Sequence, residues 1–123
     1  MGLSVKRIYD PADEGDGARF LVDRLWPRGV SKDRAALTAW VRALSPSDAL
    51  RKDFHGETAG SDAAWAAFRR AYFAELDAGG EAIEAALREV DAALACGPVT
   101  LLYAAKDDMR NNAVALRDWL DAR

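Results

Sequence analysis

The sequence predicts a small single-domain α/β fold, in which a short, mainly parallel sheet is flanked by helices. Residues 99–104 (VTLLYA) form a nearly continuous apolar run, which is typical of a strand buried on both faces. The segments 61–79 and 83–97 carry apolar residues at helical spacing. The length of 123 residues suits one domain, and no linker or internal repeat divides residues 1–123.

The first elements are two strands separated by a loop. Residues 3–9 alternate in character, and residues 19–25 have an apolar centre, so both segments favour strands. The segment DPADEGDG (residues 10–17) is rich in Pro, Gly and Asp and predicts a loop. A loop this short favours an antiparallel hairpin on length alone.

The middle of the chain predicts short elements. Ser31 is a suitable N-cap for a helical turn over residues 32–34. Residues 37–44 fit a helix by apolar spacing and a strand by their Thr, Trp and Val content, so both interpretations stay open. The pair Ser45-Pro46 predicts a helix start, with Pro in the first helical position, leading into residues 48–54.

Two longer helices, a strand and a final helix complete the fold. Ser61 or Asp62 caps the first helix, which ends at Gly79. The second helix ends at the Gly-Pro pair 97–98, directly before the apolar strand 99–104. The apolar face of the final helix consists of Ala113, Leu116, Trp119 and Leu120.

Composition excludes several classes of function. The net charge of −3 argues against a general nucleic-acid coat protein. Cys96 is the only cysteine and His55 the only histidine, so an internal disulfide and a classical structural zinc site are both out of reach. The N-terminus lacks the apolar region of a signal peptide, and no apolar run has membrane-spanning length. We expect a cytoplasmic protein with no membrane partner, no metal and no cofactor.

Polar side chains follow the two best strands. Arg24, Trp26 and Arg28 lie at the end of the strand 19–25, and Lys106 and Asn111 follow the strand 99–104. Ligand sites of parallel sheets lie beyond the carboxyl ends of the strands. We therefore expect Arg24 and Arg28 to clamp an anion, Trp26 to form a wall or stacking surface, and the other two to orient the ligand. The predicted partner is a small anionic ligand such as a phosphate, a nucleotide or a carboxylate.

Two further side chains are candidates for catalysis. Asp107 is the candidate acid–base or orienting group, and His55, within DFHGET, is the candidate general base. Both have structural alternatives: Asp107 or Asp108 would cap the last helix, and His55 would be a surface or capping imidazole. The basic residues would likewise pair with neighbouring carboxylates if the motif only packs the fold.

A basic segment gives a second functional alternative. Between residues 19 and 34 the chain has five basic and two acidic residues, so five minus two leaves +3. Arginine interleaved with Trp26 is typical of surfaces that stack unpaired bases, so Arg24–Arg34 would serve a nucleic-acid or regulatory module. Nucleic acid remains a less favoured partner because the whole chain is acidic. The sequence leaves open a monomer or a homodimer, in which Trp40 and Phe73 would supply apolar contacts.

Four segments carry a family resemblance. They are RIYDPADEGDGARFLVDRLWPRGVSK, SPSDALRKDFH, the spaced pattern W..F...Y..EL over residues 65–76, and GPVTLLYAAKDDMRNNAVAL, and together they resemble the YeaO-like family (domain of unknown function 488) nearly end to end. The resemblance implies that the first two strands are parallel, and it implies no agreed activity. By motif match, the positions carried over are Asp23, Arg24, Trp26, Pro27, Arg28, Lys106, Asp107 and Asn111.

This chain departs from the family pattern at one position of chemical interest. The pattern commonly places His just before the Asn that is Asn111 here, and this chain has Arg110 instead. The resemblance therefore implies that one candidate base is missing, which favours anion binding over acid–base catalysis. The His after Phe54 is retained as His55, but the following stretch GETAGSD diverges.

Overall fold

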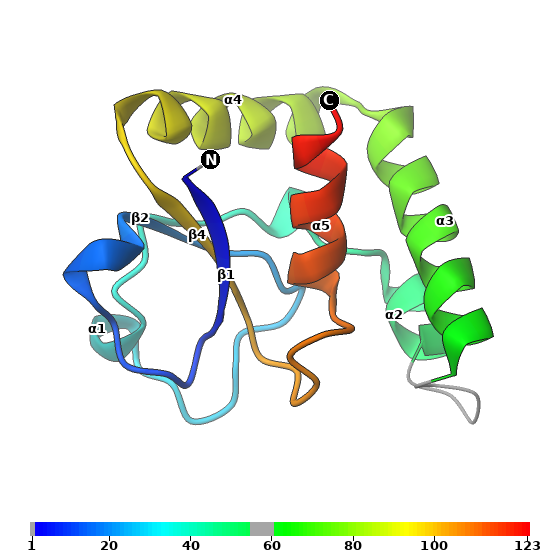
Figure 1. The fold of residues 1–123 in the computed structure, drawn as a ribbon, viewed down its shortest axis with the longest axis horizontal. Helices are drawn as coiled ribbons and strands as arrows, with labels where there is room; N and C mark the ends of the chain where they lie inside the picture. Colours follow the sequence, from blue (N-terminus) through cyan, green and yellow to red (C-terminus); the bar gives the residue numbers. More distant parts are fainter. Residues whose placement is uncertain (1, 55–60) are drawn as a thin grey trace.

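Four parallel strands form one sheet in the computed structural model, which describes residues 2–54 and 61–123 (Figure 1). The strands are β1 (Leu3–Arg7), β2 (Ala18–Leu21), β3 (Ala39–Trp40) and β4 (Val99–Tyr103). The helices are α1 (Lys32–Ala35), α2 (Asp48–Phe54), α3 (Asp62–Ala78), α4 (Glu81–Cys96) and α5 (Asn112–Asp121), with 3-10 turns η1 (Glu14–Asp16) and η2 (Arg42–Leu44). The predicted layered α/β fold with a mainly parallel sheet is confirmed.

The strand order is β1-β4-β2-β3, so the last strand in sequence lies between the first two. β4 pairs in parallel with both neighbours, for example Leu101 with Val5 and with Phe20. The hairpin favoured by loop length is therefore wrong, and the parallel order implied by the resemblance is correct. The ten residues 8–17 reach at most about 33–36 Å when extended, so the chain can return to the start of β2 without a helix.

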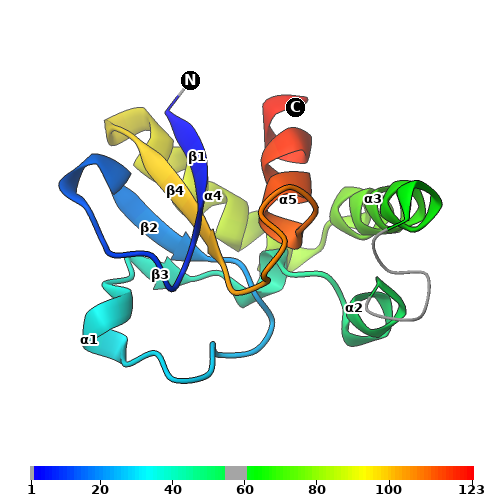
Figure 2. The ribbon, with the colours of Figure 1, turned by 60° about the horizontal axis from the view of Figure 1, so that its bottom comes forward.

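Both faces of the sheet are covered, which explains the unbroken apolar run of β4. Leu101 packs with Phe20 against α4 and α5, and Leu102, on the opposite face, packs in a second cluster with Leu21 and Ala35 of α1. Figure 2 shows α4 and α5 on one side of the sheet and α1 on the other. All five residues of β4 are buried as a result.

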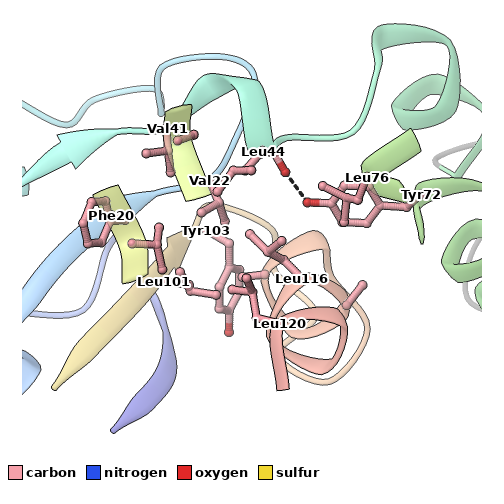
Figure 3. Close-up of a cluster of buried hydrophobic side chains, with 14 of the residues drawn as sticks. Phe20, Val22, Val41, Leu44, Tyr72, Leu76, Leu101, Tyr103, Leu116 and Leu120 are labelled. Carbon is pink, nitrogen blue, oxygen red and sulfur yellow. Dashed lines mark hydrogen bonds between the residues drawn. The ribbon is translucent and has the colours of Figure 1, made fainter. Parts of the chain in front are cut away.

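The larger core continues beyond the sheet into α3 (Figure 3). The buried Tyr72 hydroxyl donates a hydrogen bond to the Leu44 carbonyl of η2. Burial raises the pKa of Tyr72 well above its ordinary value, and the charges of Glu75 and Asp23 add to the effect. The phenol therefore stays neutral and remains a donor, which fixes α3 against η2.

Several predicted boundaries shift for local reasons. Residues 37–44 are neither one helix nor one strand: the two-residue strand β3 is followed, after Val41, by the 3-10 turn η2. The helix expected to start at Ser45-Pro46 starts at Asp48, and the Ser47 hydroxyl accepts a hydrogen bond from the Leu50 amide at 3.2 Å. Ser45 instead ends η2, since its amide donates to the Arg42 carbonyl.

Other predicted caps are confirmed. Ser31 accepts a hydrogen bond from the Arg34 amide at 3.1 Å, and Ser61 accepts one from the Ala64 amide at 3.0 Å. The segment 10–17 is a loop that also contains η1, a turn that the Pro and Gly content alone did not predict.

Candidate functional site

A pocket of about 580 Å³ opens where β2 and β4 end. This volume lies within the range of about 300–1,000 Å³ that is usual for small-molecule sites. Segments far apart in sequence form its walls: the loop after β2, helix α2, one residue of α3, the loop after β4, and the start of α5. The lining residues are 23–28, Pro46, Arg51, Phe54, Phe68, 104–107 and 110–112.

The pocket exists because Asp23 ends the pairing between β2 and β4. Its carboxylate accepts hydrogen bonds from the Ala104 amide and from the Asn112 side chain, both at 3.0 Å. The same Asn112 amide group also donates to the Val22 carbonyl at 2.9 Å. The Asp23 side chain thus takes the place of a backbone acceptor. The strand predicted over residues 19–25 therefore ends early, and the segments that follow β2 and β4 separate.

Replacing Asp23 by alanine is expected to lower the free energy of unfolding by about 1–3 kcal/mol, because two donors lose their acceptor. Urea denaturation measures the change. Asp108→Ala is the matched control: it removes an exposed carboxylate from the loop after β4 and should stay within about 0.5 kcal/mol of the parent. Equal effects of the two substitutions would show that Asp23 does not hold the pocket edge.

The charge of the lining is strongly asymmetric. Five basic residues face two acidic ones, and five minus two leaves a net charge of +3 around the pocket. The basic residues come from the loop after β2, from α2, from the loop after β4 and from the turn before α5. They are Arg24, Arg28, Arg51, Lys106 and Arg110.

Internal carboxylates compensate this charge only in part. Arg24 and Arg51 share one carboxylate, Asp48, at N–O distances of 3.8 and 3.6 Å. Within the described ranges, 2–54 and 61–123, Arg28 and Lys106 form no ion pair. The pocket therefore has more positive charge than its own neighbours neutralise.

Arg51 also has a hydrogen-bond donor without an acceptor in the described part of the chain. Its Nε is buried, yet it has no hydrogen-bond partner among the described residues. A buried donor without an acceptor is costly, and such groups often mark a place where a ligand or water completes the structure. Arg110 differs, because its guanidinium pairs with Asp62.

Both acidic residues of the lining are already engaged. Asp23 holds the pocket edge as described, and Asp107 accepts hydrogen bonds from the Met109 and Arg110 amides at 2.9 and 3.0 Å. These two bonds lower the pKa of Asp107, and the charge of Arg110 lowers it further. Asp107 is therefore ionised at neutral pH and is a weaker proton acceptor than an ordinary carboxylate.

The predicted caps of the last helix are wrong. Asn111, rather than Asp107 or Asp108, caps α5: its side-chain oxygen accepts from the Val114 amide at 2.9 Å. Its side-chain nitrogen donates to the Asp107 carbonyl, also at 2.9 Å. Because Asp107 closes its own turn, the helix begins only after that turn. Asn111 is 1% exposed and lines the pocket with both polar groups already used within the protein.

Trp26 is held by its own loop. Its indole N–H donates to the Val30 carbonyl at 2.7 Å, and its ring meets Trp40 edge to face at a centroid distance of 5.5 Å. The half-buried ring lines the pocket in a fixed position. A ring held in this way suits the predicted role of Trp26 as a wall of the pocket.

The structure brings together all the site residues predicted from sequence that lie among the described residues. Arg24, Trp26, Arg28, Lys106, Asp107 and Asn111 all line the same pocket. His55 lies outside the described residues. Sequence reasoning missed Arg51, Phe54 and Phe68, whose spacing predicted helices but gave no sign that α2 and α3 reach the strand ends.

In the part of the chain that the structure describes, no three His, Cys, Asp or Glu side chains gather closely enough to hold a metal ion. None of the described helices combines the length and the apolar character needed to cross a bilayer.

Comparison with known proteins places the chain in a family. A family model described as the inactive DUF488-N3 subclade matches residues 2–123. The uncharacterized protein YeaO of Escherichia coli K12 is 46% identical over 120 residues, which cover 98% of this chain and 97% of the relative. The uncharacterized protein Rv3073c of Mycobacterium tuberculosis H37Rv is 34% identical over 121 residues, covering 98% and 95%. No solved structure matches the chain. With a family model and relatives that match nearly its whole length, the chain belongs to the YeaO-like DUF488 family.

Proposed function

We propose that this protein binds a small anionic ligand, bearing a phosphate or carboxylate group, in the pocket where β2 and β4 end. The carrying observation is the unbalanced charge of the lining. Five basic side chains meet there, while the two acidic ones already accept hydrogen bonds from the protein. An anion supplies the missing acceptors and the missing negative charge.

Arg28 and Lys106 are the residues we assign to the anion itself. Both are exposed, and neither pairs with a carboxylate in the described part of the chain. Arg28 lies in the loop after β2 and Lys106 in the loop after β4, the two segments that separate at Asp23. The first turn of α5 also borders the pocket at Asn112, and amides at a helix N-terminus favour negative charge.

Three points favour binding over catalysis. By the resemblance described above, Arg110 stands where the family pattern commonly has His. The lowered pKa of Asp107 makes it a weak base. The matching family model is described as an inactive subclade. Acid–base roles for Asp107 and His55 stay predictions.

The test compares two double variants with the same charge change. Arg28→Gln/Lys106→Gln removes two cations from the pocket, and Lys32→Gln/Arg34→Gln removes two exposed cations of α1 outside it. Thermal shift is measured against phosphate, pyrophosphate, citrate, ribose 5-phosphate, adenosine monophosphate and phenyl phosphate. Concentrations stay in the low millimolar range at constant ionic strength, because phosphate at high concentration stabilises proteins without binding them.

At least one anion is expected to stabilise the parent and the α1 variant, with affinity falling at least about tenfold in the pocket variant. No shift with any anion, or equal loss in the two variants, would overturn the proposal. The nucleic-acid alternative makes a different prediction: oligonucleotides at low salt would bind the parent, and the α1 variant would weaken that binding.

A further inference from the structure

The pocket has an aromatic side as well as a basic one. Phe54 of α2 and Phe68 of α3 both line it, and their rings stack with centroids 4.3 Å apart and planes 23° apart. Leu25, Trp26 and Pro27 add apolar surface from the loop after β2. A site for a bare inorganic anion does not need this surface.

Helix α2 places the two kinds of surface side by side. Arg51 and Phe54 are three residues apart, so they lie on the same face of α2 with Cβ atoms about 5–6 Å apart. Both line the pocket, and the buried Nε of Arg51 has no acceptor among the described residues. A ligand that satisfies Arg51 therefore has its anionic group within about one helical turn of the Phe54 ring.

The size of the pocket points the same way. Its volume of about 580 Å³ is that of a site for an organic molecule. A bare phosphate would occupy only the basic end and leave the aromatic side against water. A phosphate monoester carries nearly two negative charges at neutral pH, and two lining cations, Arg28 and Lys106, form no ion pair within the described residues.

We infer that the ligand is a phosphate monoester with a flat aromatic group close to the phosphate. This inference rests on the proposed anion-binding function and specifies its substrate class. The phosphate contacts Arg28, Arg51 and Lys106, and the aromatic group packs on the half-buried Phe54, which the buried Phe68 supports from behind. An aryl phosphate and a nucleoside monophosphate share this chemistry, and the experiment separates them.

Isothermal titration calorimetry is run with adenosine monophosphate, phenyl phosphate, ribose 5-phosphate, inorganic phosphate and adenosine. At least one aromatic phosphate is expected to bind at least about tenfold more tightly than ribose 5-phosphate and inorganic phosphate, with neutral adenosine weaker still. Whichever aromatic phosphate binds more tightly identifies the nucleoside or aryl source. If ribose 5-phosphate binds as tightly as the aromatic phosphates, the inference falls and the proposed function stands. If no phosphate binds, the inference is overturned, and the anion screen above decides the proposed function separately.

Two variants assign the two sides of the pocket. Phe54→Leu keeps an apolar side chain but removes the ring, so affinity for phenyl phosphate should fall about fivefold while affinity for ribose 5-phosphate is unchanged. Arg51→Gln should weaken both phosphates alike. Phe73→Leu, on α3 outside the pocket lining, is the control and should change neither. A loss of phenyl phosphate binding that is equal in the Phe54 and Phe73 variants would overturn the aromatic assignment, and circular dichroism melts show that each variant is folded.

Discussion

Replacing Asp16 by alanine is expected to lower the free energy of unfolding by about 3–5 kcal/mol, because it leaves a buried charge without its partner. Arg19 is only 4% exposed and donates to the Asp16 carboxylate at 2.5 Å. Lys6 of β1 donates to the same carboxylate at 3.1 Å, and the Asp16 carbonyl accepts from the Thr100 hydroxyl of β4 at 2.8 Å. One residue thus connects three neighbouring strands.

Chemical denaturation at pH 7 measures this loss, and Glu14→Ala is the matched control. Glu14 lies in the same turn, is exposed, and carries the same charge. It should stay within about 0.5 kcal/mol of the parent. A small effect at Asp16 would mean that Arg19 reaches water or another acceptor, such as the Ala35 carbonyl to which it already donates at 2.8 Å.

The same residue predicts a dependence on pH. Burial raises the pKa of Asp16, but hydrogen bonds from the Asp13 amide, Lys6 and Arg19 outweigh burial and hold the pKa below its ordinary value of 3.8. A lowered pKa stabilises the fold only while the carboxyl is ionised, so the contribution is present above about pH 4 and is lost as pH falls through the folded pKa. The stability difference between the parent and Asp16→Asn should therefore shrink from pH 5 to pH 3. A difference that is constant over this range would contradict the assignment.

Gly17→Ala is expected to destabilise the fold by about 2–6 kcal/mol, from backbone strain and overpacking together. Gly17 has φ 65° and ψ −137°, a conformation that other residues rarely adopt. A Cβ at this position would lie 2.1 Å from the Pro98 carbonyl oxygen, which accepts the Ala18 amide where β2 begins to pair with β4. Backbone atoms would have to move, so the start of the ladder would be disturbed.

Gly15→Ala, two residues away, is a close control for this prediction. Its Cβ would meet only the Asp13 carboxylate at an ordinary 3.7 Å, and its φ is not positive. The change should be nearly neutral or stabilising by about 0.4–1 kcal/mol, because alanine restricts the unfolded chain. Equal melting temperatures of the two variants would show that the turn has room to relax.

The fold could be predicted from sequence wherever one local pattern decided the outcome. The apolar run 99–104 predicted the buried strand β4, and Ser31 and Ser61 predicted helix starts that the structure confirms. The position of β4 between the other strands was not predictable from loop length. That length restricts only where the chain can reach, whereas the pairing depends on a strand about 80 residues later in the chain.

The candidate site was predicted in part, and for a physical reason. Polar residues that follow parallel strands meet at one edge, which is how Arg28 and Lys106 could be assigned to one place. The contribution of Arg51 and Phe54 arises from how α2 packs on α3, and periodicity carries no information about it. The early end of β2 was not predicted because it depends on a hydrogen bond: the Asp23 carboxylate, rather than a backbone carbonyl, accepts from the Ala104 amide. Hydrophobic patterns carry no information about such a bond.

The hydrogen bonds of Asp23 have a consequence for how this family can diversify. The edge of the pocket is held by Asp23, Ala104 and Asn112, and none of the five basic residues takes part in those bonds. Exposed positions such as 28 and 106 are therefore free to vary under selection without disturbing the sheet. Under the proposed function, a library randomised at these two positions is expected to acquire new ligand preferences on an unchanged scaffold.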